Sequence, residues 1–302
     1  MDGDAQPRIG EDRNGGLRFN SHSRDPGRCG LLDCAPVLLM TLQHSFVVPA
    51  YGESPYLREC LRSLRSQKVH HPVTVSSSTP FEGLRALCDE FECRLVVNTD
   101  RGGIGADWNA AMLAADTGLV TIAHQDDTYL PQFSTKLMDA VERHPHSALY
   151  FCDAEEMRSD GSLRLHDRNN RVKRLMVRAA FFGREHIHRR MAKRVLLGFG
   201  NPIVCPAVTI NLHANPGFRF RKDLRTNMDW LAWVELAQTG GVTHIGHALM
   251  RHRVHDDSET ARCLDDGARL AEDSLVFGKM WPPIMARLLS RLYSRSYSGY
   301  SE

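Results

Sequence analysis

Short apolar segments alternate with amphipathic segments along residues 44–123, and this alternation constrains the fold more than any other feature of the sequence. Continuous apolar character predicts four strands, at residues 44–50, 72–76, 94–98 and 119–123. Helical spacing of apolar side chains predicts three helices between them, at residues 54–66, 81–91 and 106–115. Strands that alternate with helices form a parallel sheet covered on both faces, and ligands bind such sheets at the carboxyl ends of the strands.

Two adjacent carboxylates, Asp126 and Asp127, follow the fourth predicted strand. Carboxylates are strongly hydrated, so their position at the end of a buried strand needs a physical reason. One reason is a divalent cation, since hard oxygen ligands suit Mg²⁺ or Mn²⁺ and these ions in turn bind phosphates. The other is that the pair caps a helix that begins near Pro131. These residues alone do not decide between the two interpretations.

The composition is that of an ordinary globular protein. Hydrophobic residues make up 42% of the 302 positions, enough for one large core or two lobes that share a cleft. The formal net charge of +2 does not indicate a nucleic-acid or membrane binder, and no apolar run approaches the roughly 20 residues that span a bilayer. The eight cysteines form no Cys-x-x-Cys pair, which argues against a zinc module. We therefore expect a cytoplasmic protein that binds no nucleic acid.

A basic segment at residues 164–194 holds eleven Arg or Lys residues and only two acids, Asp167 and Glu185. Such a segment is typical of a surface that attracts an anionic acceptor or an acidic membrane. A solvated helix face whose aliphatic stems cover apolar surface also explains it, and we favour that interpretation slightly. Residues 284–297 mix leucines with arginines and indicate either a helix that lies on a membrane or one that docks onto the domain.

Four stretches of sequence carry a resemblance to a known family. They are Phe46-Val47-Val48-Pro49-Ala50-Tyr51-Gly52-Glu53, the glycine-containing residues 101–111, His124-Gln125-Asp126-Asp127, and a late pair at residues 227–233 and 251–260. Together they resemble the family 2 glycosyltransferases of GT-A fold, over residues of about 45–260. The resemblance implies an α/β fold with a Rossmann-like, mainly parallel sheet flanked by helices, an irregular acceptor-side half and C-terminal helices.

The same resemblance implies a site for a nucleoside-diphosphate sugar and a divalent cation, Mn²⁺ or Mg²⁺. Asp229 matches the family's catalytic base, and Asp126 and His255 match positions that bind the metal. The positions implied to bind the substrate are Pro49, Tyr51, Glu53, Ser77, Gly103, Asp107, Asn109, Asp127 and Arg253. Without the other motifs, Asp229 would be interpreted as an ordinary helix cap, and the run that contains Arg253 as a solvated basic loop.

Three places depart from the family's pattern. His124 occupies the first position of the Asp-x-Asp motif, and because histidine is a poor replacement for a hard Mg²⁺ ligand we expect weaker metal affinity. Trp108 stands where relatives often carry Arg, which removes a direct charge contact to phosphate. The second predicted strand runs into Ser-Ser-Ser-Thr at residues 76–79, where many relatives have an Asp that binds the base, so the nucleotide stays open.

The motifs predict a metal-dependent inverting glycosyltransferase that moves a sugar to an acceptor hydroxyl, in polysaccharide or glycolipid assembly. The expected organisation is a disordered extension at residues 1–39, a nucleotide-sugar-binding half at 40–160, an acceptor-binding and catalytic half at 161–260 and a helical tail at 261–302. The expected acceptor is a glycan or a lipid-linked molecule. Peripheral contact with the inner face of a membrane, through the basic segments, belongs to the same expectation.

Two other functions fit parts of the sequence. A degenerate transferase that binds a sugar nucleotide or a partner without turnover would explain His124, Trp108 and residues 76–79, although the retained Asp126 and Asp229 count against it. A sugar nucleotidyltransferase has a related sheet and metal-bound carboxylates. Its early basic loop is missing here, because residues 49–53 contain no Lys or Arg.

Overall fold

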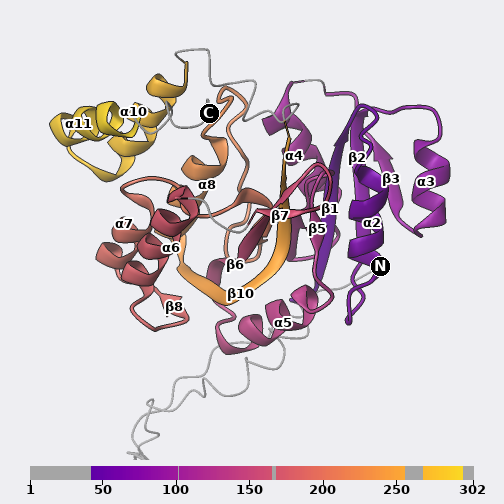
Figure 1. Ribbon diagram of the computed structural model, residues 1–302, viewed down its shortest axis with the longest axis horizontal. Helices are drawn as coiled ribbons and strands as arrows, with labels where there is room; N and C mark the ends of the chain where they lie inside the picture. Colours follow the sequence, from indigo (N-terminus) through magenta and orange to yellow (C-terminus); the bar gives the residue numbers. More distant parts are fainter. Residues whose placement is uncertain (1–41, 101, 165–167, 256–267, 295–302) are drawn as a thin grey trace, which may run out of the picture.

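The computed structural model describes residues 42–100, 102–164, 168–255 and 268–294. One ten-stranded sheet forms its centre, in the order β3-β2-β1-β4-β9-β6-β10-β5, with β7 paired to β6 and β8 to β10 (Figure 1). The strands are β1 (His44–Tyr51), β2 (Val73–Thr79), β3 (Arg94–Val97), β4 (Leu119–Ile122), β5 (Thr128–Tyr129), β6 (Ser147–Arg158), β7 (Leu163–Arg164), β8 (His186–Ile187), β9 (Val208–Asn211) and β10 (Gly241–Val254). The helices are α2 (Leu57–Arg65), α3 (Leu84–Glu90), α4 (Ile104–Leu113), α5 (Phe133–Arg143), α6 (Arg168–Phe181), α7 (Arg190–Leu197), the 3₁₀ turn η1 (Cys205–Ala207), α8 (Met228–Thr239), α10 (Ala268–Met280) and α11 (Pro283–Ser294).

The sheet has a parallel half and a mixed half. β3, β2, β1 and β4 run parallel to one another. β9 runs antiparallel to both β4 and β6, β10 runs parallel to β6, and β5 runs antiparallel to β10. The strands and helices predicted for residues 44–123 are confirmed within a few positions. The long strand β10 of the mixed half was not predicted from the sequence.

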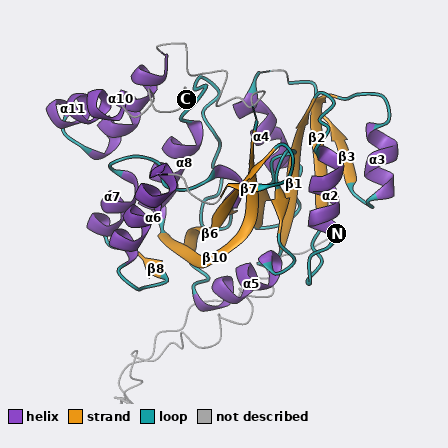
Figure 2. Cartoon of the chain, in the orientation of Figure 1, coloured by secondary structure: helices purple, strands orange, loops and turns teal. Residues whose placement is uncertain are grey.

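Side chains that alternate along β1 enter two hydrophobic cores, one on each face of the sheet. Figure 2 shows the helices arranged around the central sheet. Phe46 and Val48 lie in the core that α2, α3 and α5 cover, whereas Val47 lies in the core beneath α4 and α8. This two-residue period is the pattern expected of a strand buried on both faces. The α/β architecture predicted from the sequence is confirmed.

The expected division near residue 160 does not separate two independent cores. β9 lies between β4 and β6, and β10 pairs with β6 along most of its length, so both halves build the same sheet. The domain division therefore stays a prediction about function. The predicted extension at 1–39 and residues 261–267 of the tail lie outside the described residues. Across the ranges that the structure describes, no helix has both the length and the apolar character needed to cross a bilayer.

Candidate active site

The carboxylate of Asp126 lies just beyond the carboxyl end of β4. Its Oδ1 accepts a hydrogen bond from Ser54 Oγ at 3.0 Å, and its Oδ2 lies 3.4 Å from His255 Nε2. Ser54 follows β1 and His255 follows β10, so segments far apart in sequence meet at this carboxylate. His255 Nε2 is buried and makes no aligned hydrogen bond within the described part of the chain. The structure thus brings the two predicted metal ligands together.

Asp127 is buried, with a side chain only 1% exposed, and the protein itself binds its oxygens. Oδ1 accepts hydrogen bonds from the Arg253 backbone N–H at 2.8 Å and from His252 Nδ1 at 3.1 Å. Burial alone would raise the pKa of Asp127, but the facing His252 outweighs burial and lowers it. The same contact raises the pKa of His252 against the effect of its burial. Asp127 therefore fastens the loop after β4 to β10, and its predicted contact with the substrate stays a prediction.

The guanidinium of Arg253 is almost completely engaged by the protein. Nη2 donates to Glu59 Oε2 at 2.5 Å, Nε to the Asp126 carbonyl oxygen at 3.0 Å, and Nη1 to the carbonyl oxygens of residues 158–159 at 3.3 and 3.4 Å. The guanidinium carbon also lies 4.3 Å from the centre of the Tyr56 ring. Arg253 therefore holds α2, the loop after β4 and the end of β6 in one arrangement, and its predicted contact with the substrate stays untested.

Two of the departures from the family's pattern contact each other. The rings of His124 and Trp108 lie 5.2 Å apart, and Trp108 packs edge-on against Phe220 at 5.1 Å. Burial lowers the pKa of His124, so its ring is neutral near pH 7. An uncharged aromatic pair therefore fills the space beside Asp126 where charged side chains were expected.

Asp229 lies in the first turn of α8. Its Oδ2 accepts a hydrogen bond from Asn201 Nδ2 at 2.8 Å, and its Oδ1 accepts one from the Trp230 backbone N–H at 2.6 Å. Burial raises the pKa of Asp229 to about 6, although both hydrogen bonds act in the opposite direction. A carboxylate with a pKa just below neutral is mostly ionised at pH 7 and still basic enough to accept a proton from an alcohol as it reacts.

Two further residues connect Asp229 to the loop after β4. Burial raises the pKa of the Cys205 thiol most strongly, and the charges of Asp229 and Asp127 raise it further, so this thiol lies within electrostatic reach of both carboxylates. Lys173 on α6 favours the ionised form of Asp229 and opposes protonation of His252. The charges of Asp229, Asp127 and Lys173 therefore act over a shared region of the protein.

The loop after β1 offers exposed side chains to this site. Tyr51 and Glu53 are both exposed, as a stacking face and a carboxylate for a ligand require. The Tyr51 backbone N–H donates to Gln125 Oε1 at 3.1 Å, and its carbonyl oxygen accepts from Gln125 Nε2 at 3.2 Å. Gln125 thus holds the loop after β1 against the loop after β4.

The two predicted substrate positions inside strands are less accessible. Pro49 is half-buried in β1 and pairs with Ser76 of β2. Ser77 is 1% exposed, and its Oγ accepts the Thr79 backbone N–H at 3.2 Å. Both residues shape the end of the parallel sheet, and their contact with a ligand stays a prediction.

The amino end of α4 carries the three remaining predicted positions. Gly103 has a φ of +83°, which a residue with a side chain rarely adopts, and it precedes the helix directly. Asn109 is buried and exchanges two hydrogen bonds with the Phe220 backbone, at 2.8 and 2.9 Å. Asp107 is half-buried, and its Oδ1 has no hydrogen-bond partner among the described residues. Asn109 therefore anchors α4, while Gly103 and Asp107 are placed for a ligand.

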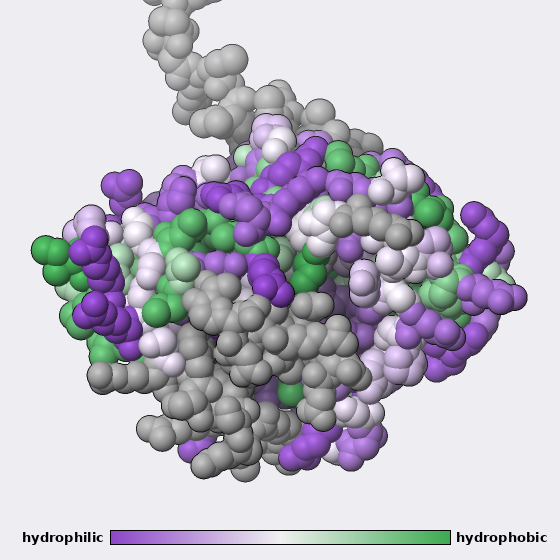
Figure 3. Space-filling model, turned by 90° about the horizontal axis from the view of Figure 1, so that it is seen from above, coloured by the Kyte–Doolittle hydropathy of each residue, from purple (hydrophilic) through white to green (hydrophobic). Residues whose placement is uncertain are grey.

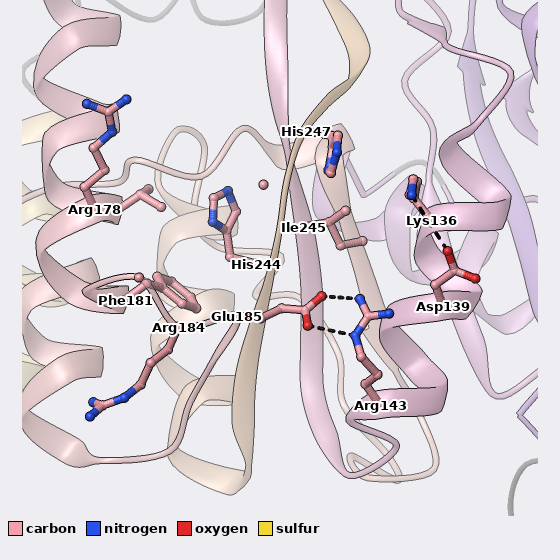
Figure 4. Close-up of a pocket in the computed structure, with 13 residues that line it drawn as sticks. Lys136, Asp139, Arg143, Arg178, Phe181, Arg184, Glu185, His244, Ile245 and His247 are labelled. Carbon is pink, nitrogen blue, oxygen red and sulfur yellow. Dashed lines mark hydrogen bonds and ion pairs between the residues drawn. The ribbon is translucent and has the colours of Figure 1, made fainter.

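A cavity of about 390 Å³ lies elsewhere, between α5, the end of α6 and the middle of β10 (Figure 4). None of the predicted site residues lines it. Arg143 and Glu185 form a double hydrogen bond at its wall, which neutralises both charges. The guanidinium groups of Arg178 and Arg184 point away from its centre in Figure 4. This cavity is separate from the candidate active site.

The sequence profile described as glycosyl transferase family 2 matches residues 45–206, more than half of the chain. The chain belongs to glycosyl transferase family 2. It is accordingly a glycosyltransferase, and the enzyme class predicted from the four motifs is confirmed. A comparison with curated proteins returned no match.

Solved structures share the GT-A fold of this family 2 member. S. aureus TarS 1-349 in complex with UDP-GlcNAc has a TM-score of 0.60 at 14% identity, covering 85% of this chain and 73% of that one. The mannosyltransferase PcManGT from Pyrobaculum calidifontis, in complex with GDP-Man and Mn2+, has a TM-score of 0.58 at 15% identity, with the same two coverages. A longer TarS chain is matched over 42% of its length. At these identities the likeness establishes the fold alone.

The residues at Asp126 fit a cation that the substrate helps to bind. No group of three or more His, Cys, Asp or Glu side chains suited to a metal occurs within the described ranges. Asp126 and the unbonded Nε2 of His255 supply one oxygen and one nitrogen ligand. Mg²⁺ is commonly bound by one or two carboxylates together with substrate phosphates and water, and Mn²⁺ also accepts imidazole. The donor set is therefore incomplete alone and suited to a cation that arrives with a diphosphate.

Several residues of the site escaped prediction. Ser54, Asn201 and Cys205 belong to no motif, and only their neighbours in the fold reveal their roles. Gln125 lies inside the Asp-x-Asp-like motif and Lys173 inside the basic segment at residues 164–194, but neither pattern predicted the contacts that these two residues make. The later part of the motif at residues 256–260, and Arg101 of the glycine-containing loop, lie outside the described residues.

Proposed function

We propose that this enzyme moves a sugar from a nucleoside-diphosphate sugar to an acceptor hydroxyl, with inversion at the anomeric carbon and Asp229 as the general base. The observation that carries the proposal is the buried Asp229 carboxylate at the start of α8, which Asn201 and the Trp230 backbone N–H hold in place and whose pKa burial raises to about 6. Nucleotide sugars bound to TarS and to PcManGT, which share the fold, support a donor of this class.

Asp229 would act on the acceptor. Asn201 holds Oδ2 and the Trp230 N–H holds Oδ1, so the carboxylate has a fixed orientation at the start of α8. A hydroxyl positioned against it loses its proton as its oxygen attacks the anomeric carbon from the face opposite the diphosphate. With one base and no second carboxylate acting as a nucleophile, the product has inverted configuration.

Asp126 and His255 are the residues that would hold a divalent cation, Mn²⁺ or Mg²⁺. When bound, such an ion supplies Lewis-acid stabilisation of the negative charge on the departing diphosphate. The Mn2+ in the PcManGT complex supports this assignment. Arg253 and Asp127 keep the loop in place, because the first donates to the Asp126 carbonyl oxygen and the second accepts from β10.

The donor would lie between the loop after β1 and the amino end of α4. Tyr51 is free to stack on the base, and Glu53 to accept hydrogen bonds from the ribose or base. The backbone at Gly103 has no Cβ to obstruct a diphosphate at the start of α4, where helix N–H groups favour negative charge. Asp107, which carries an unbonded oxygen, adds a hydrogen-bond acceptor there.

For the acceptor we infer a glycan or lipid-linked molecule, with a role in polysaccharide or glycolipid assembly. Support comes from Lys173, which places positive charge beside the base, and from the other basic residues of α6. A negatively charged acceptor, such as one that carries a phosphodiester, would be attracted to this side of the site.

The test is a thermal-shift screen of nucleoside diphosphates, each with and without Mn²⁺, on the wild type and on Asp126→Ala. A ligand present at 100 times its dissociation constant stabilises a protein by about 2.7 kcal/mol, which such a scan detects. We expect one nucleotide to give a metal-dependent shift that is absent in the variant. A screen in which no nucleotide shifts the wild type would contradict the proposal and favour a degenerate binding protein.

A further inference from the structure

The outward side of α6 carries an apolar stripe. Val172, Leu175 and Ala179 recur at spacings of three and four residues along the helix, and Phe182 follows directly after the helix ends at Phe181. All four are exposed, with Leu175 at 66% and Phe182 at 84%. An amphipathic surface helix normally buries such a stripe. Here the buried side of α6 is a second apolar stripe that includes Val177 and Phe181.

The exposed face of α6 also carries positive charge. Arg171, Arg174 and Arg178 are exposed and alternate with the apolar positions, and the sequence of α6 contains no acid. Figure 4 shows the guanidinium groups of Arg178 and Arg184 directed away from the cavity beneath the helix. We call the seven residues 171, 172, 174, 175, 178, 179 and 182 the α6 face.

The helix α11 repeats this combination. Ile284, Leu288 and Leu292 stand four residues apart and are exposed, Ile284 at 86%, while Ala286 and Ser290 form the buried side. Its exposed residues are Ile284, Met285, Arg287, Leu288, Arg291 and Leu292, which we call the α11 face. No acid occurs in α11. Figure 3 shows apolar and strongly polar side chains adjacent to each other at the left edge, where α10 and α11 lie.

The two helices belong to the same side of the molecule. α6, α7, α10 and α11 lie on the side opposite α2 and α3 (Figure 1). Trp281, which precedes α11, joins α7 to the tail: its Nε1 donates to the Gly198 carbonyl oxygen at 2.7 Å, and Arg194 lies 4.9 Å from its ring. Most of the large hydrophobic side chains exposed in the described chain belong to this side.

We propose that the α6 face and the α11 face are a membrane-binding surface for bilayers that contain anionic lipid. A helix that presents leucines and isoleucine among arginines lies in the interfacial plane, with its apolar side chains in the acyl boundary and its cations at the headgroups. Contact between two copies of this chain would instead oppose arginines to arginines, because a two-fold interface pairs a patch with itself. Membrane binding by this surface does not depend on catalytic activity, so it can be tested independently of the proposed function.

Membrane contact would orient the enzyme. Lys173 of α6 lies within electrostatic reach of Asp229 on α8, so the helix that carries the α6 face also borders the proposed base. The nucleotide-binding loop after β1 lies on the other half of the sheet. A bilayer bound at α6 and α11 would therefore lie on the acceptor side of the site.

The experiment is vesicle flotation of the full chain. The wild type, the double variant Leu175→Ser with Leu288→Ser, and the double variant Arg174→Glu with Arg287→Glu are mixed with vesicles of phosphatidylcholine alone or with added phosphatidylglycerol. Leu113→Ser is the matched control, because Leu113 is 64% exposed on α4. The substituted side chains are all exposed, and unchanged thermal midpoints verify folding.

We expect the wild type and Leu113→Ser to float with the anionic vesicles. We expect both double variants to bind these vesicles at least about tenfold more weakly. The proposal is overturned if the wild type does not float with anionic vesicles, if it floats equally with phosphatidylcholine alone, or if the double variants bind as the wild type does. Light scattering of the same proteins tests whether the two faces instead bind a second copy of the chain. A wild-type dimer that Leu175→Ser with Leu288→Ser converts to a monomer would assign the faces to self-association and overturn membrane binding.

Discussion

The two halves of the sheet contribute differently to the site. In the parallel half, β1 to β4 each connect to the next through one helix, and their carboxyl ends supply the loop after β1 and the Asp126–Asp127 pair. In the mixed half, β9, β6 and β10 pair across long stretches of sequence, and this half supplies Asp229 and His255. The comparison teaches that repeated local units build the side proposed to bind the donor, whereas long-range pairing builds the side that holds Asp229, the proposed base.

The variant Asp229→Asn has the largest expected effect and tests whether the two halves of the sheet have different roles. If Asp229 is the general base, kcat falls by about 10²–10⁴, the usual contribution of a well-placed general base. Binding of the donor, measured by calorimetry, stays within error of the wild type because the parallel half is intact. A large loss of donor affinity would show that the two halves do not divide the work in this way.

A second prediction distinguishes the roles of the two neighbouring carboxylates, Asp126 and Asp127, which follow β4. Asp127→Ala leaves His252 and the Arg253 N–H without their buried partner, so the free energy of unfolding falls by about 3 kcal/mol. Asp126→Ala removes a partly exposed carboxylate, and its stability changes far less while the metal-dependent nucleotide shift disappears. Urea unfolding of both variants checks this. Equal destabilisation of the two variants would mean that the contact of Asp127 with β10 contributes no special stability.

The smallest expected effect is the dependence of kcat/KM and of stability on pH, which tests the role of Asp229. Because its pKa is raised to about 6 and the base must be ionised, kcat/KM should fall about tenfold per pH unit below that value. The sign for stability is opposite: a carboxyl whose pKa is raised on folding stabilises the fold while protonated, and this contribution is lost as pH rises through about 6. Asp229→Asn should therefore have a higher thermal midpoint than wild type at pH 8 and no advantage at pH 4. A pH profile without a limb near 6 would remove Asp229 from the reaction.

Sequence reasoning was accurate where contacts are local. The strands and helices of residues 44–123 follow from periodicity, because each unit buries its own apolar face against its neighbour. β10 escaped prediction because its polar and apolar residues follow no regular alternation, and its pairing with β6 shifts register between Ile245 and Met250. The same holds for β5, which is two residues long and exists through its contact with β10.

In the candidate site, too, motif positions were predicted from the sequence, whereas contacts between distant segments were not. Motif positions predicted Asp126 and His255, which lie 3.4 Å apart although 129 positions separate them in the chain (255 minus 126). The motif assigned Asp126 to the metal and Asp127 to the substrate, but it did not predict the burial of Asp127, which arises from contact with β10. Arg253 matched a position implied to bind the substrate, and its engagement with Glu59 and Tyr56 depends on α2, which no local pattern relates to residue 253.

The position of β9 limits how such an enzyme can be recombined. Because β9 lies between β4 and β6, and β10 covers the other edge of β6, a fragment ending at residue 160 would leave β4 with an open edge and β6 without both main neighbours. Unpaired edges of this kind aggregate. If residues 161–260 were exchanged between homologues, the incoming β9 and β10 would have to pair with the resident β4 and β6. New specificities must arise by substitutions in loops that preserve the strand order, and shuffling in the laboratory should place its crossovers there.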